Sequence, residues 1–205
     1  MVTLEVLMIN EGFGQNKSKN EKIPPGQYLE KSFPILSAGP TVHINKESWD
    51  FTIFENDTII SKISWEELNN FPKKEINTDI HCVTKWSKLE TNWEGVSFKD
   101  IFETVPIKKK YKYIMAYSEG GYTTNVPMND LLDDKGFLAF KYDKKDITPE
   151  HGGPVRLFIP HLYFWKSAKW IRGIKLLEND EPGFWEKYGY HMYGDPWKEQ
   201  RYQGD

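Results

Sequence analysis

The chain alternates short apolar stretches with polar turns, at a spacing typical of short strands. Residues 49–54 alternate apolar and polar side chains, residues 56–57 form a turn signal, and residues 58–60 begin a returning strand. Further strand patterns lie at residues 111–117 and 137–142. Short consecutive strands joined by turns favour sheets that are partly antiparallel.

Helix signals are few and short. Ser64 and Glu67 have the spacing of a capping box, so we expect a helix that ends near Pro72. A second short helix is expected over residues 97–103, and a helical turn over residues 127–132. Many short strands with few short helices predict an α+β fold with mixed sheets.

The organised part of the chain is predicted to start at residue 23. Residues 1–22 open with an apolar patch and then become polar and glycine-containing. We interpret them either as a flexible N-terminal arm, which could clasp the body or a second copy of the chain, or as a disordered tail. Residues 23–205 are of a size that fits a single domain with its own core.

Composition narrows the classes of partner. The net charge of −3 argues against nucleic acid or an acidic membrane surface as the main partner. No apolar run reaches the roughly 20 residues of a membrane span, so we expect no membrane insertion. The N-terminus lacks the pattern of an export signal, and a single cysteine suits a reducing compartment, so we expect a cytoplasmic protein.

Cys82 is the only cysteine of the chain, so it cannot form an internal disulfide. Packing is one interpretation, because free cysteine is often buried. Its neighbours favour chemistry: His81 and Lys85 could favour a thiolate, and Trp86 could wall a pocket. Residues 80–84 are β-type and then break into a polar turn, and pockets commonly open where strands end.

Two further stretches carry unusual residues. Residues 149–160 contain a Gly-Gly turn and then a strand with Arg156, which needs an anionic partner if its head is buried and none if it lies on an exposed edge. Gly120 and Gly121 follow a predicted strand. They would either let the backbone approach another group closely or form a hairpin-like bend.

The last quarter of the chain is aromatic. Residues 161–174 interleave aromatic rings with lysine and arginine, a pattern also found in proteins that bind single strands of nucleic acid, which the acidic balance disfavours here. Residues 182–202 are interpreted as aromatic packing that closes the body. Glu186 and His191 lack the spacing of a zinc-binding helix motif.

The segment His-Cys-Val-Thr-Lys-Trp-Ser at residues 81–87, with Trp-Glu-Gly-Val at residues 93–96, resembles the molybdenum-binding segment of the sulfite oxidase-like, molybdopterin-dependent oxidoreductases. The resemblance covers nearly the whole body and includes the blocks around Arg156 and Lys169. It implies that family's molybdopterin-binding-domain fold, with molybdenum and molybdopterin as cofactors. A protein thiolate is a natural further ligand for a metal held by dithiolene sulfurs.

The resemblance also implies roles for single residues. Cys82 would be the metal ligand. Cofactor contacts are expected from Ser37, Ala38, Gly39, Ser118, His151, Arg156, Ser167, Ala168 and Lys169. A guanidinium, an ammonium and backbone N–H groups are the donors that a terminal phosphate requires. On the substrate side the candidates are His81, Lys85 and Tyr122.

Together these implications predict an oxidoreductase that works by oxygen-atom transfer. The arginine-rich run that follows the cysteine in true sulfite oxidases is missing, so we expect reduction of small S- or N-oxides, with sulfite oxidation as the alternative. Electrons would come from a separate protein or small carrier, and a homodimer remains open. Two other classes stay open as well: a metal-free cysteine nucleophile activated by histidine, and a non-catalytic cofactor-binding protein.

Overall fold

The computed structural model describes residues 23–107 and 110–205, so the predicted N-terminal arm at residues 1–22 lies outside the described residues. One sheet has the strand order β3-β2-β11-β6-β7. Its members are β2 (Asp50–Glu55), β3 (Thr58–Ser64), β6 (Tyr113–Ser118), β7 (Thr123–Pro127) and β11 (Ile171–Leu177). Strand β11 runs parallel to β2 and antiparallel to β6. The strands predicted near residues 49–60 and 111–117 are confirmed.

The other sheet has the order β1-β5-β8-β10, with β4 also paired to β5 and β9 to β8. Its members are β1 (Tyr28–Leu29), β4 (Lys74–His81), β5 (Trp86–Ser97), β8 (Phe137–Tyr142), β9 (Lys145–Asp146) and β10 (Arg156–Phe158). Only β1 and β5 pair in parallel here. The mixed, partly antiparallel sheets of the prediction are therefore present.

The helices are short, as predicted. They are α1 (Trp65–Asn70), α2 (Phe98–Thr104), α3 (Asn129–Leu132) and α4 (Phe184–Lys187), with 3₁₀ turns η2 (Lys46–Ser48), η3 (Pro149–His151), η4 (Phe164–Lys166) and η5 (Pro196–Lys198). At α1 both hydrogen bonds of the capping box between Ser64 and Glu67 are formed. Within the described ranges, no helix is long and apolar enough to cross a membrane.

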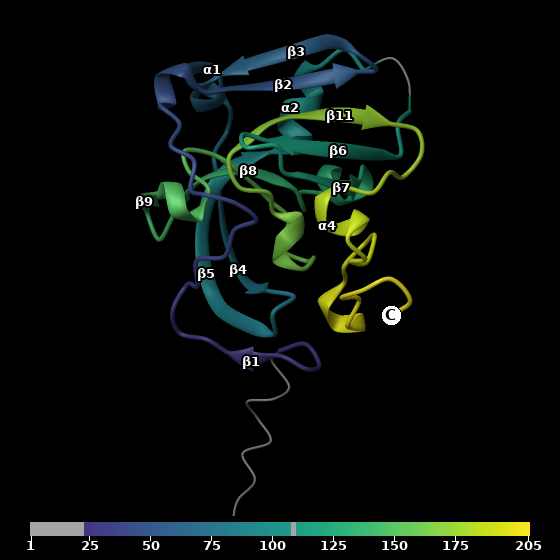
Figure 1. Ribbon diagram of the computed structural model, residues 1–205. Helices are drawn as coiled ribbons and strands as arrows, with labels where there is room; N and C mark the ends of the chain where they lie inside the picture. The colour runs from purple at the N-terminus through teal and green to yellow at the C-terminus, as the bar shows by residue number, and fades with distance from the viewer. Residues whose placement is uncertain (1–22, 108–109) are drawn as a thin grey trace, which may run out of the picture.

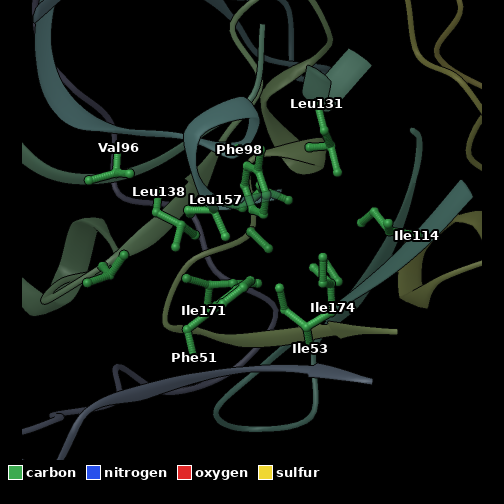
Figure 2. Packing of buried hydrophobic residues seen from close by; sticks show 14 of the residues in the cluster. Phe51, Ile53, Val96, Phe98, Ile114, Leu131, Leu138, Leu157, Ile171 and Ile174 are labelled. Carbon is green, nitrogen blue, oxygen red and sulfur yellow. The ribbon is translucent and has the colours of Figure 1, made fainter. Parts of the chain in front are cut away.

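A large apolar core holds the two sheets together. Figure 2 shows Phe51 and Ile53 of β2 and Ile174 of β11 packed near side chains of the other sheet such as Leu138 and Leu157. All five are fully buried. Each buried side chain of this size contributes about 1.5–3 kcal/mol to folding. A second cluster, which includes Cys82 and Trp93, packs along β4, β5, β8 and β10 of the other sheet, whose long strands β4 and β5 are seen in Figure 1.

Three local predictions differ from the structure. Strand β4 ends at His81, so residues 82–85 form a turn instead of continuing the strand. Residues 123–127 are a strand, and the helical turn predicted from residue 127 begins at Asn129. Strands β5 and β11 were not predicted; the polar and glycine residues within them hide the pattern. A Cβ on Gly173 of β11 would lie 2.1 Å from the hydroxyl of Tyr117, so a side chain cannot be placed there.

Candidate functional site

A cavity of about 470 Å³ lies where segments far apart in the sequence meet. Its lining comes from the ranges 33–42, 82–86, 119–122, 151–170 and 184–190. The C-terminal segment after α4 turns back beside the end of β4 and β5, as Figure 1 shows in yellow, and contacts support this: the rings of Trp197 and His81 lie 6.2 Å apart. Residues 184–190 of this last part of the chain form one side of the cavity wall.

Folding brings most of the predicted site residues to this cavity. The wall includes Ser37, Ala38, Gly39, Cys82, Tyr122, His151, Arg156, Ser167 and Lys169. Four predicted residues are not part of the wall: His81, Lys85, Ser118 and Ala168. Lys85 is exposed, and the other three are buried elsewhere in the packing.

Cys82 begins the tight turn between β4 and β5. Its N–H donates to the carbonyl of Trp86 (2.9 Å), and its own carbonyl accepts from the N–H of Lys85 (3.0 Å) and from Nε2 of Gln27 (3.1 Å). Lys85 closes the turn with a φ of 74°, in the left-handed region. Because three hydrogen bonds hold the Cys82 backbone, the thiol has a fixed place on the cavity wall.

The residue Cys82 is 8% exposed. Burial raises the pKa of Cys82, and the hydroxyl of Thr84, which donates to Sγ at 3.1 Å, partly offsets that rise. His81 does not supply a cation here: its Nδ1 lies 2.8 Å from Oγ of Ser87, and burial lowers its pKa to about 4. Within the described residues no hydrogen bond joins His81 to Cys82, which a histidine-activated nucleophile would require.

Arg156 is 1% exposed, so its guanidinium is buried and does not reach solvent from the edge of a sheet. Its terminal nitrogens donate to the carbonyls of His151 (2.7 Å) and Ser167 (2.5 Å), and its guanidinium lies 4.2 Å from the ring centre of Phe164. Its Nε has no partner in the described chain. Among the described residues its partners are carbonyls and a ring, so the anionic partner expected for a buried arginine is left for a bound ligand to supply.

Lys169 and His151 share this part of the cavity. Nζ of Lys169 donates to the carbonyl of Glu150 (2.6 Å), and no ion pair to Lys169 or Arg156 occurs within residues 23–107 and 110–205. Burial and then Arg156 lower the pKa of Lys169 to about 8. Burial, Arg156 and Lys169 together lower the pKa of His151 to about 4. Arg156 and Lys169 are the cationic part of the cavity, and His151 lies beside them as a neutral ring near pH 7.

Glycines shape the backbone around this part. Gly152 has a φ of +99°, and a Cβ on it would lie 2.7 Å from Cβ of Lys169. Gly120 and Gly121, with φ of +84° and +85°, form the hairpin turn between β6 and β7, closed by the N–H of Ser118 donating to the carbonyl of Tyr122 (2.9 Å). Both glycines line the cavity, but a Cβ on Gly120 would meet only Val42 at 3.5 Å and one on Gly121 would meet nothing within 4 Å, so of the two interpretations the structure shows the bend.

The donor set fits a molybdenum cofactor with a terminal phosphate. Cys82 offers a sulfur ligand of the kind that soft metals take. Arg156 offers a buried guanidinium with one unused N–H, and Lys169 an ammonium, both without a carboxylate in an ion pair. A buried cation without an anion in the protein is costly, unless a ligand supplies the anion.

Sequence reasoning identified only Trp86 as a pocket wall and missed the rest of the aromatic side of the cavity. Trp86, Trp165, Trp185 and Tyr190 all line it, and we call these four residues the aromatic wall. Trp185 and Tyr190 come from the tail interpreted as packing alone. The density of rings after residue 182 could have suggested a pocket wall, but only folding shows that Tyr190 and Cys82 line the same cavity.

Known proteins resemble this chain over most of its length. It is 41% identical to the "Uncharacterized oxidoreductase YuiH" of Bacillus subtilis over 94% of this chain and 99% of that protein. It is 23% identical to the "Protein-methionine-sulfoxide reductase catalytic subunit MsrP" of Campylobacter jejuni over 74% of this chain, and spans 57% of that longer protein.

The fold is also shared with a solved structure. The sulfane dehydrogenase SoxCD of Paracoccus pantotrophus superposes with a TM-score of 0.60 at 18% identity, over 68% of this chain and 40% of that one. This confirms the predicted α+β fold of the sulfite oxidase-like group. Residues 38–185 match the family described as "Oxidoreductase molybdopterin binding domain". The chain therefore belongs to the sulfite oxidase-like molybdopterin-dependent oxidoreductases, and is an enzyme whose cofactors are molybdopterin and molybdenum.

Proposed function

We propose that the protein reduces small S-oxides or N-oxides by oxygen-atom transfer, with Cys82 as the protein ligand of molybdenum. The overall reaction consumes two electrons and two protons for each oxide and releases the sulfide or amine and water. When bound, the cofactor supplies the oxygen-atom transfer and redox chemistry. The protein binds the cofactor, excludes water and selects the substrate.

The observation that carries the proposal is the wall beside Cys82, which is aromatic and not densely cationic. Sulfite near neutral pH is a compact anion and calls for several cationic donors. Of the arginines that folding could have brought there, Arg172 pairs with Asp50 and Arg201 with Glu199, and neither lines the cavity. Arg156 does line it, but two of its nitrogens already hold carbonyls.

We assign the cofactor contacts to residues that line the cavity. Arg156, Lys169 and Ser167 would hold the phosphate end, and His151 and the loop of residues 37–39 the pterin. Tyr122 stays a candidate near the substrate; its hydroxyl donates to the carbonyl of Trp165 (2.7 Å) and burial raises its pKa well above 10, so it acts as a neutral group. The likeness to a methionine sulfoxide reductase supports the substrate class.

In this proposal a separate protein or small carrier supplies the electrons, in the cytoplasm. Paired assays on cofactor-loaded protein test the substrate: oxidation of reduced viologen with methionine sulfoxide or trimethylamine N-oxide, and reduction of ferricyanide with sulfite. We expect the higher kcat/KM with an oxide. A sulfite kcat/KM well above that of every oxide would contradict the proposal, and no turnover in either direction would favour a cofactor-binding role.

A further inference from the structure

A buried ion pair lies directly behind the aromatic wall. Nζ of Lys166 in η4 is 2.7 Å from Oε1 of Glu186 in α4, and both side chains are 0% exposed. Lys166 also donates to the carbonyl and Oδ1 of Asn125 (3.0 and 2.7 Å) and to the carbonyl of Met192 (2.6 Å). The ammonium is therefore fully surrounded by acceptors.

Glu186 links this pair to the cavity. Its Oε1 accepts from the hydroxyl of Thr124 (3.0 Å) and from the indole Nε1 of Trp165 (2.9 Å). Trp165 lines the cavity, and so does Trp185, the neighbour of Glu186 in α4. Tyr190 stacks on Trp185 with ring centres 5.0 Å apart and meets Trp165 edge-on at 5.1 Å. One carboxylate thus anchors, directly or through its helix, three of the four rings of the wall.

Stability alone does not account for such a pair. Removing two charges from water is costly, and apolar side chains of similar volume often serve a fold as well or better. What a buried pair can add is a single defined conformation. Here it fixes the only polar atom of the Trp165 ring, because an indole N–H bonded to Glu186 is not free to bond a group in the cavity.

We propose that Glu186, held by Lys166, is a positioning residue that keeps the aromatic wall apolar and in one arrangement, and so selects oxides that carry an apolar group. This inference rests on the proposed oxide reduction for its substrate. It differs from the ordinary view of a core ion pair because it predicts an effect on KM that a merely structural role would not produce.

The test compares two double variants that both remove the ion pair, so that neither leaves a lone buried charge. Lys166→Met with Glu186→Gln retains a carbonyl oxygen that can accept from Trp165. Lys166→Met with Glu186→Leu does not. With methyl phenyl sulfoxide and reduced viologen, we expect the Leu variant to raise KM about ten-fold at nearly unchanged kcat, the size of effect that a lost pocket contact produces. The Gln variant should stay near the parent protein.

A second readout does not depend on turnover. In protein labelled with ¹⁵N-tryptophan, with or without cofactor, the Trp165 indole N–H should be protected from solvent exchange in the parent and Gln variants and unprotected in the Leu variant. If the parent protein reduces no oxide, the proposed function fails, while the exchange data still decide whether Glu186 fixes Trp165. Trp165→Phe, which keeps a ring but removes the N–H, should reproduce the KM change if the Leu variant does not fold.

Three outcomes would overturn the inference. One is unchanged exchange protection in the Leu variant. Another is lost protection with an unchanged KM in the Leu variant. The third is an equal rise of KM in both double variants, which would assign the effect to the charges and not to the anchored indole.

Discussion

Two buried cations of this protein, Lys166 and Arg156, are solvated by the chain in different ways. Both are at most 1% exposed. Lys166 has a carboxylate at 2.7 Å and further oxygen acceptors around it. Arg156 has two carbonyls, a ring and an Nε without a partner in the described chain, and it lines the cavity. Lys166 is satisfied by groups of the chain, whereas Arg156 is left for an anion that the described residues do not supply.

The same contrast is visible in the electrostatics. Burial lowers the pKa of Arg156 to about 9. Burial also lowers the pKa of Lys166, but there Glu186 opposes it through charge and a hydrogen bond. Burial and charge state alone would not separate a structural cation from a ligand-binding one. The hydrogen-bond and ion-pair partners do separate them: Lys166 has a carboxylate partner and Arg156 has none among the described residues.

The largest effect is expected from breaking the ion pair between Lys166 and Glu186. Lys166→Met leaves the Glu186 carboxylate buried without its cation, which typically costs about 3–5 kcal/mol of folding free energy. For a chain of this size the melting temperature should fall by more than about 6 °C. The double variant Lys166→Met with Glu186→Leu should recover most of the loss. Thermal melts of cofactor-free protein measure both, and equal melting temperatures of the single and double variants would contradict the account.

Arg156→Met should act on the cofactor instead of the fold. Loss of charge-assisted contacts to phosphate should weaken cofactor binding by about 1.5–3 kcal/mol, a factor of ten or more. The stability of cofactor-free protein should change little, because the loss of two carbonyl hydrogen bonds is offset by the removal of a buried charge that no anion of the described residues balances. Molybdenum and pterin content measure the occupancy.

Arg172→Met is the matched control for this variant, because Arg172 pairs with Asp50 and does not line the cavity. It should retain full occupancy. Equal occupancy in the two arginine variants would place the phosphate elsewhere.

A smaller change is expected at Lys169, which is less enclosed and already donates to a backbone carbonyl. Lys169→Ala should weaken cofactor binding by about 1 kcal/mol, since water screens a partly exposed contact. A competition assay between variant and parent protein for limiting cofactor would detect a difference of this size. A loss larger than that of Arg156→Met would reverse the order proposed here.

Local signals predicted much of the fold. The capping box at Ser64, the turn at residues 56–57 and the helix after Ser97 each depend on a few neighbouring residues, and all three are present. Strand β11 depends on long-range packing. Residue 173 must be glycine because the side chain of Tyr117 occupies the space that a Cβ would take, and the sequence does not show that contact. The turn at Cys82 was missed because Val83 and Thr84 favour strands, while the backbone bonds to Trp86 and Lys85 enforce a turn.

The site could be predicted in part for the same reason. The resemblance identified Cys82, Arg156 and Lys169, and the cavity brings them together. It did not identify Trp185 or Tyr190, whose position depends on how the tail folds back. Sequence proximity also misled at His81: it is adjacent to Cys82 in the chain, yet its ring bonds to Ser87 and does not line the cavity.

The measurement that tests the central claim most directly is molybdenum X-ray absorption on the cofactor-loaded parent and on Cys82→Ser. The account predicts that the variant retains most of its molybdenum and pterin, loses one sulfur from the metal's coordination, and loses oxide reduction, because a hydroxyl is a poorer ligand for a soft metal. Thr84→Val, which removes the hydroxyl bonded to Sγ but keeps the thiol, should retain the coordination. Unchanged sulfur coordination and unchanged turnover in Cys82→Ser would contradict the account.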